Sequence, residues 1–299
     1  ADGLNVLFTP DFGALTDFSV WSAAYGQVFF SLSVAFSIMI AYSSYLPRKT
    51  DLSNSGLIVG LSNAGFEFMA AIGVFAALGF LALTQGAEVT EVAGSGGVGL
   101  AFIVFPQIIS SLPALQPVFG VIFFLSLFFA GITSMVSILE CVVAAVREKF
   151  DLGRTAAVNW ICGVAALISI LYVTEGGLFY LDTVDHFVNA YGLVVAGLAE
   201  VLLVAWFAKQ LKEQRDHLNE ISYIKMGPWW TASMKFITPI LLSVVVLYGI
   251  WNEFKGNYSD YPTSGLLFVG MGAVALTLLL ALTLALNSRV PHQLDIVKE

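Results

Sequence analysis

Seven long apolar segments constrain the fold of this chain more than any other feature. They cover approximately residues 20–46, 54–85, 118–146, 156–174, 188–208, 231–252 and 264–287. An α-helix needs about 20 apolar residues to cross the hydrocarbon core of a bilayer, and each segment reaches or nears that length. The segments therefore predict seven membrane-spanning helices, and no separate soluble domain is left over.

The composition agrees with a membrane protein and not with a soluble one. Hydrophobic residues make up 58% of the chain and charged residues 11%, whereas soluble domains average about 25% charged residues. A single soluble core could not hide so many apolar side chains, so we expect an all-α polytopic membrane protein with one transmembrane domain, residues 1–299. The net charge of −8 provides no basic stripe for phosphates, which argues against a nucleic-acid partner.

One apolar run is too short to count as an eighth span. Residues 98–112 contain Pro106, and Pro113 follows directly. Proline removes a backbone donor and interrupts a helix. We therefore expect residues 98–113 to form an extracellular surface or re-entrant helix.

Basic residues predict the orientation of the chain. If the seven spans alternate across the bilayer, every Lys and Arg except Lys255 falls on the same side. Cytoplasmic loops are enriched in Lys and Arg. We therefore expect a multi-pass protein of the cell (inner) membrane, with the amino terminus of the chain outside and the carboxyl terminus in the cytoplasm.

Seven spans with this orientation are also the topology of a receptor, and span count alone does not give function. The last span carries no Lys for a retinal Schiff base, and the outer loops carry no cysteine pair. Cys141 and Cys162 lie inside apolar runs, where we expect small packed residues. A seven-span receptor-like protein that binds ligand without transport stays an alternative. A channel is disfavoured because no span has a continuous polar face.

Enzyme chemistry has no signature in the chain. No nucleophile–base pair, phosphate-binding loop or zinc spacing is present. His186, His217 and His292 lie in or near expected loops and far apart in sequence, so we predict no transition-metal site.

The first apolar segment carries a group of serines at its middle. The stretch GQVFFSLSVAFSIMIAYSSY, residues 26–45, places Ser31, Ser33 and Ser37 around Phe30 and Phe36. Each serine hydroxyl could return its hydrogen bond to the preceding helical turn at little cost. Alternatively, the helix unwinds at mid-membrane, where freed carbonyls line a protein cavity and bind ions.

Two further segments carry polar residues at membrane depth. Asn63 and Glu67 lie one turn apart on one helix face; an ionised carboxylate in a span costs roughly 2.5–3.5 kcal/mol, so Glu67 is either functional or a partnered structural acid. Ala130, Thr133 and Ser134 share a face that suits either close helix packing or a weak Na⁺ site built from neutral oxygens. Glu140, nearer the cytoplasmic end of that span, must be paired or solvated.

Acidic residues mark the outer end of the fifth span. In LDTVDHF, residues 181–187, Asp182 and Asp185 precede the expected start of the helix at residue 188. Carboxylates are stabilised at a helix amino terminus. These two residues are therefore either solvated caps or parts of a gate.

Taken in order, these segments resemble the neurotransmitter:sodium symporter family, whose bacterial members include LeuT-type amino-acid transporters. The resemblance covers essentially the whole chain. The residues that carry it are GQVFFSLS, SGLIVGLSNAGFE, FPQIISSLP, FFAGITS, LDTVDHF, GLAE and KFITPILL.

The resemblance implies a fold and a missing part. Family members have roughly twelve spans, arranged as two inverted repeats of about five plus two more. The chain corresponds to the second repeat of the LeuT-like fold and the two extra helices, with its first helix broken at mid-membrane. The expected partners are the bilayer, the missing amino-terminal five spans and a second copy in a homodimer. Ala35 and Ser37 replace glycines of many relatives, which would narrow or reshape the pocket.

The resemblance also implies roles for individual residues. The sodium-binding residues would be Ser31 and Asn63 at one site, and Ala130 (through its carbonyl), Thr133 and Ser134 at a second. The substrate-binding residues would be Phe30, Ser31, Ser33, Phe36, Ser134 and Ile138. The gating residues would be Gln27, Phe30 and Asp185 outside, and Tyr45 with Glu148 on the cytoplasmic side.

Together these implications predict a sodium-coupled symporter. The cargo would be a small neutral, apolar amino acid, moved by alternating access with Na⁺ as the coupling ion. Glu67 falls where chloride-dependent relatives carry a neutral residue beside bound chloride. Because a carboxylate supplies the same negative charge, transport would be independent of chloride.

Overall fold

The fold is known from a computed structural model that describes residues 2–93 and 97–286. Within these ranges the secondary structure is helical and contains no strand. Among the described residues, six helices are long and apolar enough to cross a membrane. The prediction of an all-α polytopic membrane protein is confirmed.

The six long helices match the expected spans from the second to the seventh. They are Leu52–Gln85 (α4), Gln116–Phe150 (α8), Arg154–Tyr172 (α9), Gly177–Phe207, Pro228–Lys255 and Thr263–Leu286. The Gly177–Phe207 helix begins well before the expected residue 188, and residue 287 of the last expected span lies outside the described residues.

Three of these helices contain π-helical turns. Gly177–Phe207 comprises α10 (Gly177–Phe187), η3 (Val188–Leu193), α11 (Val194–Leu202) and η4 (Leu203–Phe207). Pro228–Lys255 comprises α13 (Pro228–Ala232), η5 (Ser233–Ile237) and α14 (Thr238–Lys255). Thr263–Leu286 comprises α15 (Thr263–Gly265), η7 (Leu266–Met271) and α16 (Gly272–Leu286).

The first expected span is two helices and not one. α2 (Phe18–Ser31) ends where the serines begin, and α3 (Ile38–Ser44) follows after a six-residue gap. Neither piece alone is long enough to cross a bilayer. The helix is therefore interrupted, as the second interpretation of the serines predicts.

The chain divides into two compact units. The first contains Ala1–Trp21 and Gly56–Met135, and the second contains Ser22–Ser55 and Val136–Glu299. α2, α4 and α8 contribute residues to both.

The first unit has its core around the end of α4. Leu78, Ala82 and Val89 are buried together, and Leu100 and Val104 pack against them. The unit also contains α1 (Asp2–Phe8), η1 (Phe12–Thr16), α5 (Val89–Ala93), α6 (Gly97–Gly99), η2 (Leu100–Val104) and α7 (Phe105–Ser110).

The short apolar run is helical from Gly97 to Ser110, so its helix ends before the expected residue 113. Pro106 does not break it, because the π-helical turn η2 comes directly before the helix α7 that contains the proline near its start. A π turn widens the backbone where the ring would otherwise clash with the carbonyl of the preceding turn.

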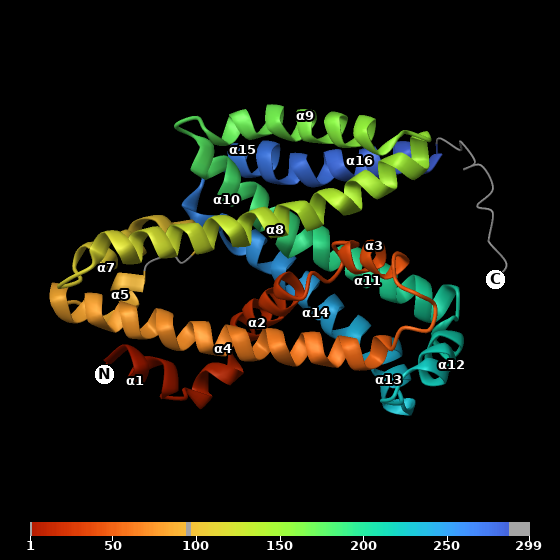
Figure 1. The fold of residues 1–299 in the computed structure, drawn as a ribbon, viewed down its shortest axis with the longest axis horizontal. Coiled ribbons are helices and arrows are strands. Elements are labelled where there is room, and N and C mark those ends of the chain that lie inside the picture. Colours follow the sequence, from red (N-terminus) through yellow and green to blue (C-terminus); the bar gives the residue numbers. More distant parts are fainter. Residues whose placement is uncertain (1, 94–96, 287–299) are drawn as a thin grey trace. The chain divides into compact units, whose positions relative to one another are not determined.

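In the second unit, α11 packs along α14, and α10 packs against η7 (Figure 1). At the α10–η7 contact, a Cβ at Gly270 would lie 2.1 Å from the Phe187 ring, so only glycine fits there. The remaining elements of this unit are α12 (Leu211–Ile221) and η6 (Tyr258–Asp260).

Candidate functional site

The backbone between α2 and α3 adopts a conformation that ordinary helices do not contain. Ser33, Ala35 and Ser37 have φ angles of 52°, 64° and 59°. Left-handed conformations cost a non-glycine residue roughly 1–2 kcal/mol each. Ala35 and Ser37 are also the positions where the family resemblance expects glycine. Such strain persists only where surrounding structure enforces it, and it is concentrated at ligand sites.

The interruption exposes backbone oxygens. Within the described part of the chain, the carbonyls of Leu32, Ser33, Val34 and Ala35 accept no backbone hydrogen bond. In an unbroken helix each of these carbonyls would bond the amide four residues later. The loop therefore presents a row of acceptors to a cation or an ammonium group.

Two aromatic rings flank this row. The centroids of Phe30 and Phe36 lie 6.1 Å apart with the rings at 74°, an edge-to-face pair. The structure thus brings together two of the predicted substrate-binding residues. Ser31 is the last residue of α2, and Gln27 lies one turn earlier on the same helix.

α8 holds the interrupted segment within the second unit. The Cys141 thiol donates to the Phe36 carbonyl at 3.6 Å, and the Tyr42 hydroxyl donates to Ser137 Oγ at 2.7 Å. Ile138 lies on α8 between these two partners in sequence.

The expectation that both cysteines are packed is wrong for Cys162, which is exposed, because the described side chains leave its position on α9 uncovered.

Tyr45, a predicted gating residue, has a partner that the sequence did not indicate. Its hydroxyl donates to Glu140 Oε1 at 2.9 Å, and Arg154 Nη2 donates to Glu140 Oε2 at 2.8 Å. Glu140 is therefore paired, as a carboxylate in a span requires. Glu148 lies two turns further along α8, in its last turns.

The first unit holds the other predicted ion ligands. Asn63 Nδ2 donates to Glu67 Oε1 at 3.3 Å, so the acid is hydrogen-bonded along its own helix. Thr133 Oγ1 donates to the carbonyls of Phe129 and Ala130 at 3.0 and 2.9 Å. Ser134 follows on the same continuous helix, α8. A hydroxyl that donates its hydrogen backwards presents oxygen to its other neighbours.

The sequence comparisons decide the family. The profile of the sodium:neurotransmitter symporter family matches residues 1–291. This chain belongs to that family. It is a transporter family of multi-pass membrane proteins, and the described helices fit that class.

Several curated proteins are similar to this chain. An uncharacterised sodium-dependent transporter of Methanocaldococcus jannaschii is 42% identical over 266 residues, which cover 89% of this chain and 54% of the relative. A sodium-dependent nutrient amino acid transporter of Drosophila grimshawi is 30% identical, and the match covers 88% of this chain and 42% of the relative. A sodium- and chloride-dependent neutral and basic amino acid transporter of Mus musculus is 29% identical, and the match covers 84% of this chain and 40% of the relative.

The chain thus spans about half the length of these relatives, or less. The family name and the names of all three relatives include sodium, and the name of the mouse relative also includes chloride.

The two carboxylates of α10 differ from the expectation for this family member. Asp182 and Asp185 are not at a helix amino terminus, because α10 begins at Gly177 and both residues lie inside it. Asp182 accepts hydrogen bonds from the hydroxyls of Tyr258 and Tyr261 at 3.1 and 3.0 Å. Asp185 accepts one from Asn189 at 2.8 Å.

The two tyrosines are locked as donors to Asp182. The pKa of Tyr258 is raised, mainly by burial and to a smaller extent by the charge of Asp182 and the hydrogen bond to it. The hydrogen bond with Asp182 raises the pKa of Tyr261. Both phenols therefore stay neutral well above physiological pH.

Sequence reasoning also missed His186. It lies within α10, and its Nε2 is 2.7 Å from Glu253 Oε1 on α14. A histidine four residues after Asp182 on a helix was the available signal, but only the fold brings Glu253 to it. Among the described residues, no group of three or more His, Cys, Asp or Glu could hold a metal ion.

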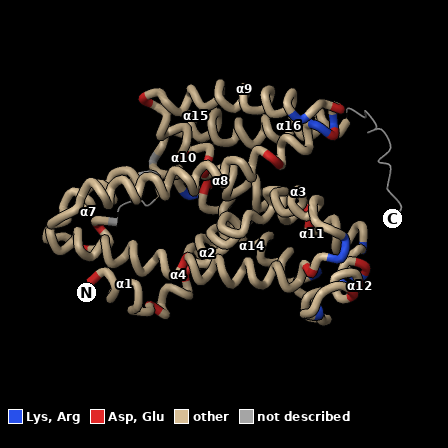
Figure 2. Tube along the Cα trace, viewed as in Figure 1, with Lys and Arg blue, Asp and Glu red and all other residues tan. Residues whose placement is uncertain are grey.

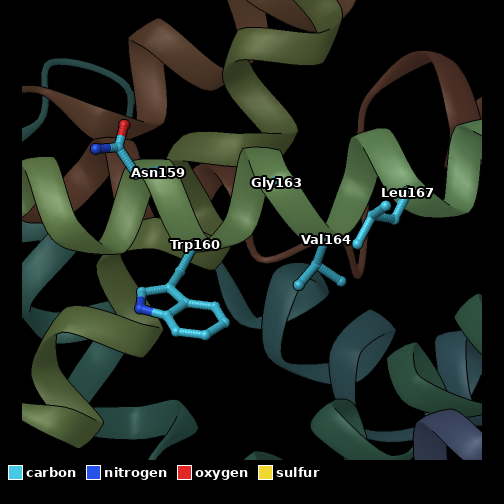
Figure 3. Close-up of a pocket in the computed structure, with 5 residues that line it drawn as sticks. All are labelled: Asn159, Trp160, Gly163, Val164 and Leu167. Carbon is cyan, nitrogen blue, oxygen red and sulfur yellow. The ribbon is translucent and has the colours of Figure 1, made fainter.

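A hollow on the surface of α9 is separate from these residues. It has a volume of about 510 Å³, and the described residues that line it are Asn159, Trp160, Gly163, Val164 and Leu167 (Figure 3). Trp160 and Val164 project from the same side of the helix. The lining is apolar apart from Asn159, which suits lipid tails or another apolar helix and not an ion.

Proposed function

We propose that a transporter containing this chain carries a small neutral, apolar amino acid into the cell together with Na⁺, by alternating access. The observation that carries the proposal is the interruption between Ser31 and Ile38. It combines open carbonyls, strained backbone and an aromatic pair in a span of a sodium symporter family member.

The interruption supplies the substrate site. The carbonyls beside Ser33 and Ala35 would receive the amino group, which is a cation that needs oxygen acceptors. Phe30 and Phe36 would enclose the side chain, with Ile138 at the floor of the pocket. The other predicted substrate-binding residues are Ser31, Ser33 and Ser134. Apolar rings favour an apolar side chain, because a polar one would lose its hydration without gaining partners.

Two sodium sites are proposed, each built from neutral oxygens. Ser31 and Asn63 would contribute to the first. The Ala130 carbonyl, Thr133 and Ser134 would contribute to the second. Hydroxyl, amide and carbonyl oxygens suit a weakly bound monovalent ion, whereas divalent ions prefer more carboxylates.

Glu67 would make transport independent of chloride. Its carboxylate accepts a hydrogen bond from Asn63, a proposed ligand of the first sodium site. A fixed negative charge there compensates the bound Na⁺ as a chloride ion would.

The proposed gates lie at the two ends of the pathway. Gln27, Phe30 and Asp185 would close the outer side. Tyr45 and Glu148 would close the cytoplasmic side, and we add Glu140 and Arg154, because Tyr45 bonds directly to Glu140.

The proposed orientation places the carboxyl terminus in the cytoplasm of the cell membrane. In the second unit, the blue Lys and Arg segments gather around α12 and the turn between α8 and α9 (Figure 2). Lys255, at the end of α14, is the described exception. Basic residues on one side are typical of cytoplasmic loops.

Sodium coupling would be energetically sufficient. A charge that crosses about 100 mV gains about 2.3 kcal/mol, and a tenfold gradient adds about 1.4 kcal/mol. Two Na⁺ ions would therefore supply roughly 7 kcal/mol, which corresponds to about 10⁵-fold accumulation of substrate.

The test uses the complete transporter in proteoliposomes, with radiolabelled leucine as the probe. We expect uptake that requires an inward Na⁺ gradient and continues when gluconate replaces chloride. Uptake that is equal with choline in place of Na⁺ would contradict the coupling. Loss of uptake in gluconate would remove the role given to Glu67. Sodium-independent binding without flux would favour a receptor-like protein instead.

A further inference from the structure

His186 joins three elements at the outer end of the second unit. Its Nε2 lies 2.7 Å from Glu253 Oε1 on α14. Its ring stacks on Tyr258, with centroids 3.7 Å apart and planes at 14°. The side chains of His186 and Glu253 are only 22% and 25% exposed. One residue of α10 is thus tied both to α14 and to the loop that follows it.

Asp185, a proposed residue of the outer gate, lies close to these contacts of His186. Asp185 precedes His186 directly on α10, and Asp182 lies one turn earlier. Asp182 is held by Tyr258, the ring on which His186 stacks, and by Tyr261. The position of the α10 turn that carries Asp185 therefore depends on the contacts of His186.

The titratable groups around His186 come from several elements. Asp182 and Asp185 lie on α10, and Glu253 lies on α14. Tyr258 and Tyr261 lie on the loop after α14. Tyr191 lies on η3, and its ring centroid is 6.1 Å from that of the imidazole. α9 also packs on α10, and its titratable residue nearest to α10 in sequence is Tyr172. The other two elements that pack on α10, η7 and α16, carry no titratable residue. The charged group in direct contact with the imidazole is the Glu253 carboxylate, whereas Lys255, also on α14, has its Nζ 5.5 Å from the centroid of the Trp251 ring.

We propose that His186 is a positioning residue for the outer end of α10, and that its protonation makes transport depend on external pH through the placement of Asp185. The inference rests on the proposed function for the gating role of Asp185. An imidazole changes charge near neutral pH. The other titratable partners named above are carboxylic acids and phenols, and His186 is the one imidazole among them.

Protonation strengthens each contact that the neutral ring makes. The acceptor Glu253 is a carboxylate, so protonation adds the attraction of an ion pair to the hydrogen bond that the neutral ring already donates, and the contact becomes stronger. The stack on Tyr258 becomes a cation–π contact. At acidic external pH α10 is held to α14 and its loop, and at alkaline pH the same contacts weaken and the turn that carries Asp185 moves more freely.

The experiment measures the apparent KM for leucine in proteoliposomes of the complete transporter, at saturating Na⁺, from about pH 5.5 to about pH 8.5. For the unmodified protein we expect a change of about fivefold with a single midpoint. His186→Gln and Glu253→Gln should each remove most of the dependence of the apparent KM on pH. The double variant should show the same pH dependence as either single variant. His217→Gln, which alters an exposed histidine on α12, is the matched control and should keep the profile.

The result that overturns the proposal is a His186→Gln profile that follows that of the unmodified protein, or an unmodified protein without pH dependence. If no sodium-dependent uptake is found, the proposed function fails, and the inference is judged by hydrogen exchange of residues 177–187. There we expect opening that increases about fivefold with pH in the unmodified protein and is pH-independent in both variants. Equal exchange behaviour in all proteins would reject the positioning role.

Discussion

The first apolar segment and α8 both carry hydroxyl residues among large apolar side chains, yet only one of them remains a continuous helix. In α8, Thr133 returns its hydrogen to the preceding turn, and the helix runs unbroken from Gln116 to Phe150. In the first segment, the helix ends at Ser31 and resumes at Ile38.

The difference lies in where the hydrogen bonds come from. A back-bonded hydroxyl keeps its partners within one helix, so it needs nothing from the rest of the molecule. The interrupted segment instead depends on another helix, because Cys141 and Ser137 of α8 contact Phe36 and Tyr42. Residue type alone does not separate the two cases; the availability of partners does.

The largest effect is expected where the interruption is most strained. Ala35→Val places a β-branched side chain at φ 64°, close to Gly197, where an added Cβ would lie 3.5 Å from the Ala35 Cβ. We expect a loss of leucine uptake of at least about tenfold and a destabilisation of about 2 kcal/mol. Ala35→Gly should instead be tolerated. Uptake and thermal unfolding in detergent measure both effects.

The matched control for Ala35→Val is Ala281→Val on α16, an exposed alanine in a regular helix, where we expect a change within about 0.5 kcal/mol. Similar losses at both positions would mean that the left-handed backbone has no special role.

The next effect tests the continuous helix. Thr133→Ala should raise the Na⁺ concentration needed for half-maximal uptake by about tenfold, because one oxygen ligand is lost. The helix should keep its backbone hydrogen bonds. Thr277→Ala is the control, since Thr277 makes the same kind of back bond to Ala273 in α16. Sodium titrations of uptake measure both variants. An unchanged titration for Thr133→Ala would remove that residue from the site.

The smallest effect concerns the contact between the two helices of the comparison. Cys141→Ala removes the donor to the Phe36 carbonyl, and we expect the apparent KM for leucine to rise about fivefold, equivalent to about 1 kcal/mol. Cys141→Ser keeps a donor and should restore most of the affinity. If the alanine and serine variants behave alike, the hydrogen bond does not position Phe36.

Some of this arrangement could be predicted from the sequence, and the limits have physical causes. Ser31, Ser33 and Ser37 indicated an interruption, because three hydroxyls at one depth are unusual in a lipid-facing helix. They did not indicate which residues take positive φ, since that depends on contacts with α8. Similarly, the need of Glu140 for a partner was predictable, but its bonds to Tyr45 and Arg154 were not.

The start of α10 shows the same limit at a helix end. Asp182 and Asp185 suggested a cap near residue 188, but the helix begins at Gly177, because the loop after α14 supplies tyrosine donors that satisfy Asp182 within the helix. A carboxylate with side-chain partners has no need of a helix terminus.

The sequence by itself determined the class of this protein, its apolar helices and its family, because hydrophobic length and ordered motifs are local properties of the chain. Only the tertiary structure decided which polar residues meet. The pairs Tyr45–Glu140, Cys141–Phe36 and His186–Glu253 join residues 67 to 105 positions apart. Hydrogen bonds act over a few ångströms, so such pairs exist only once the helices have packed.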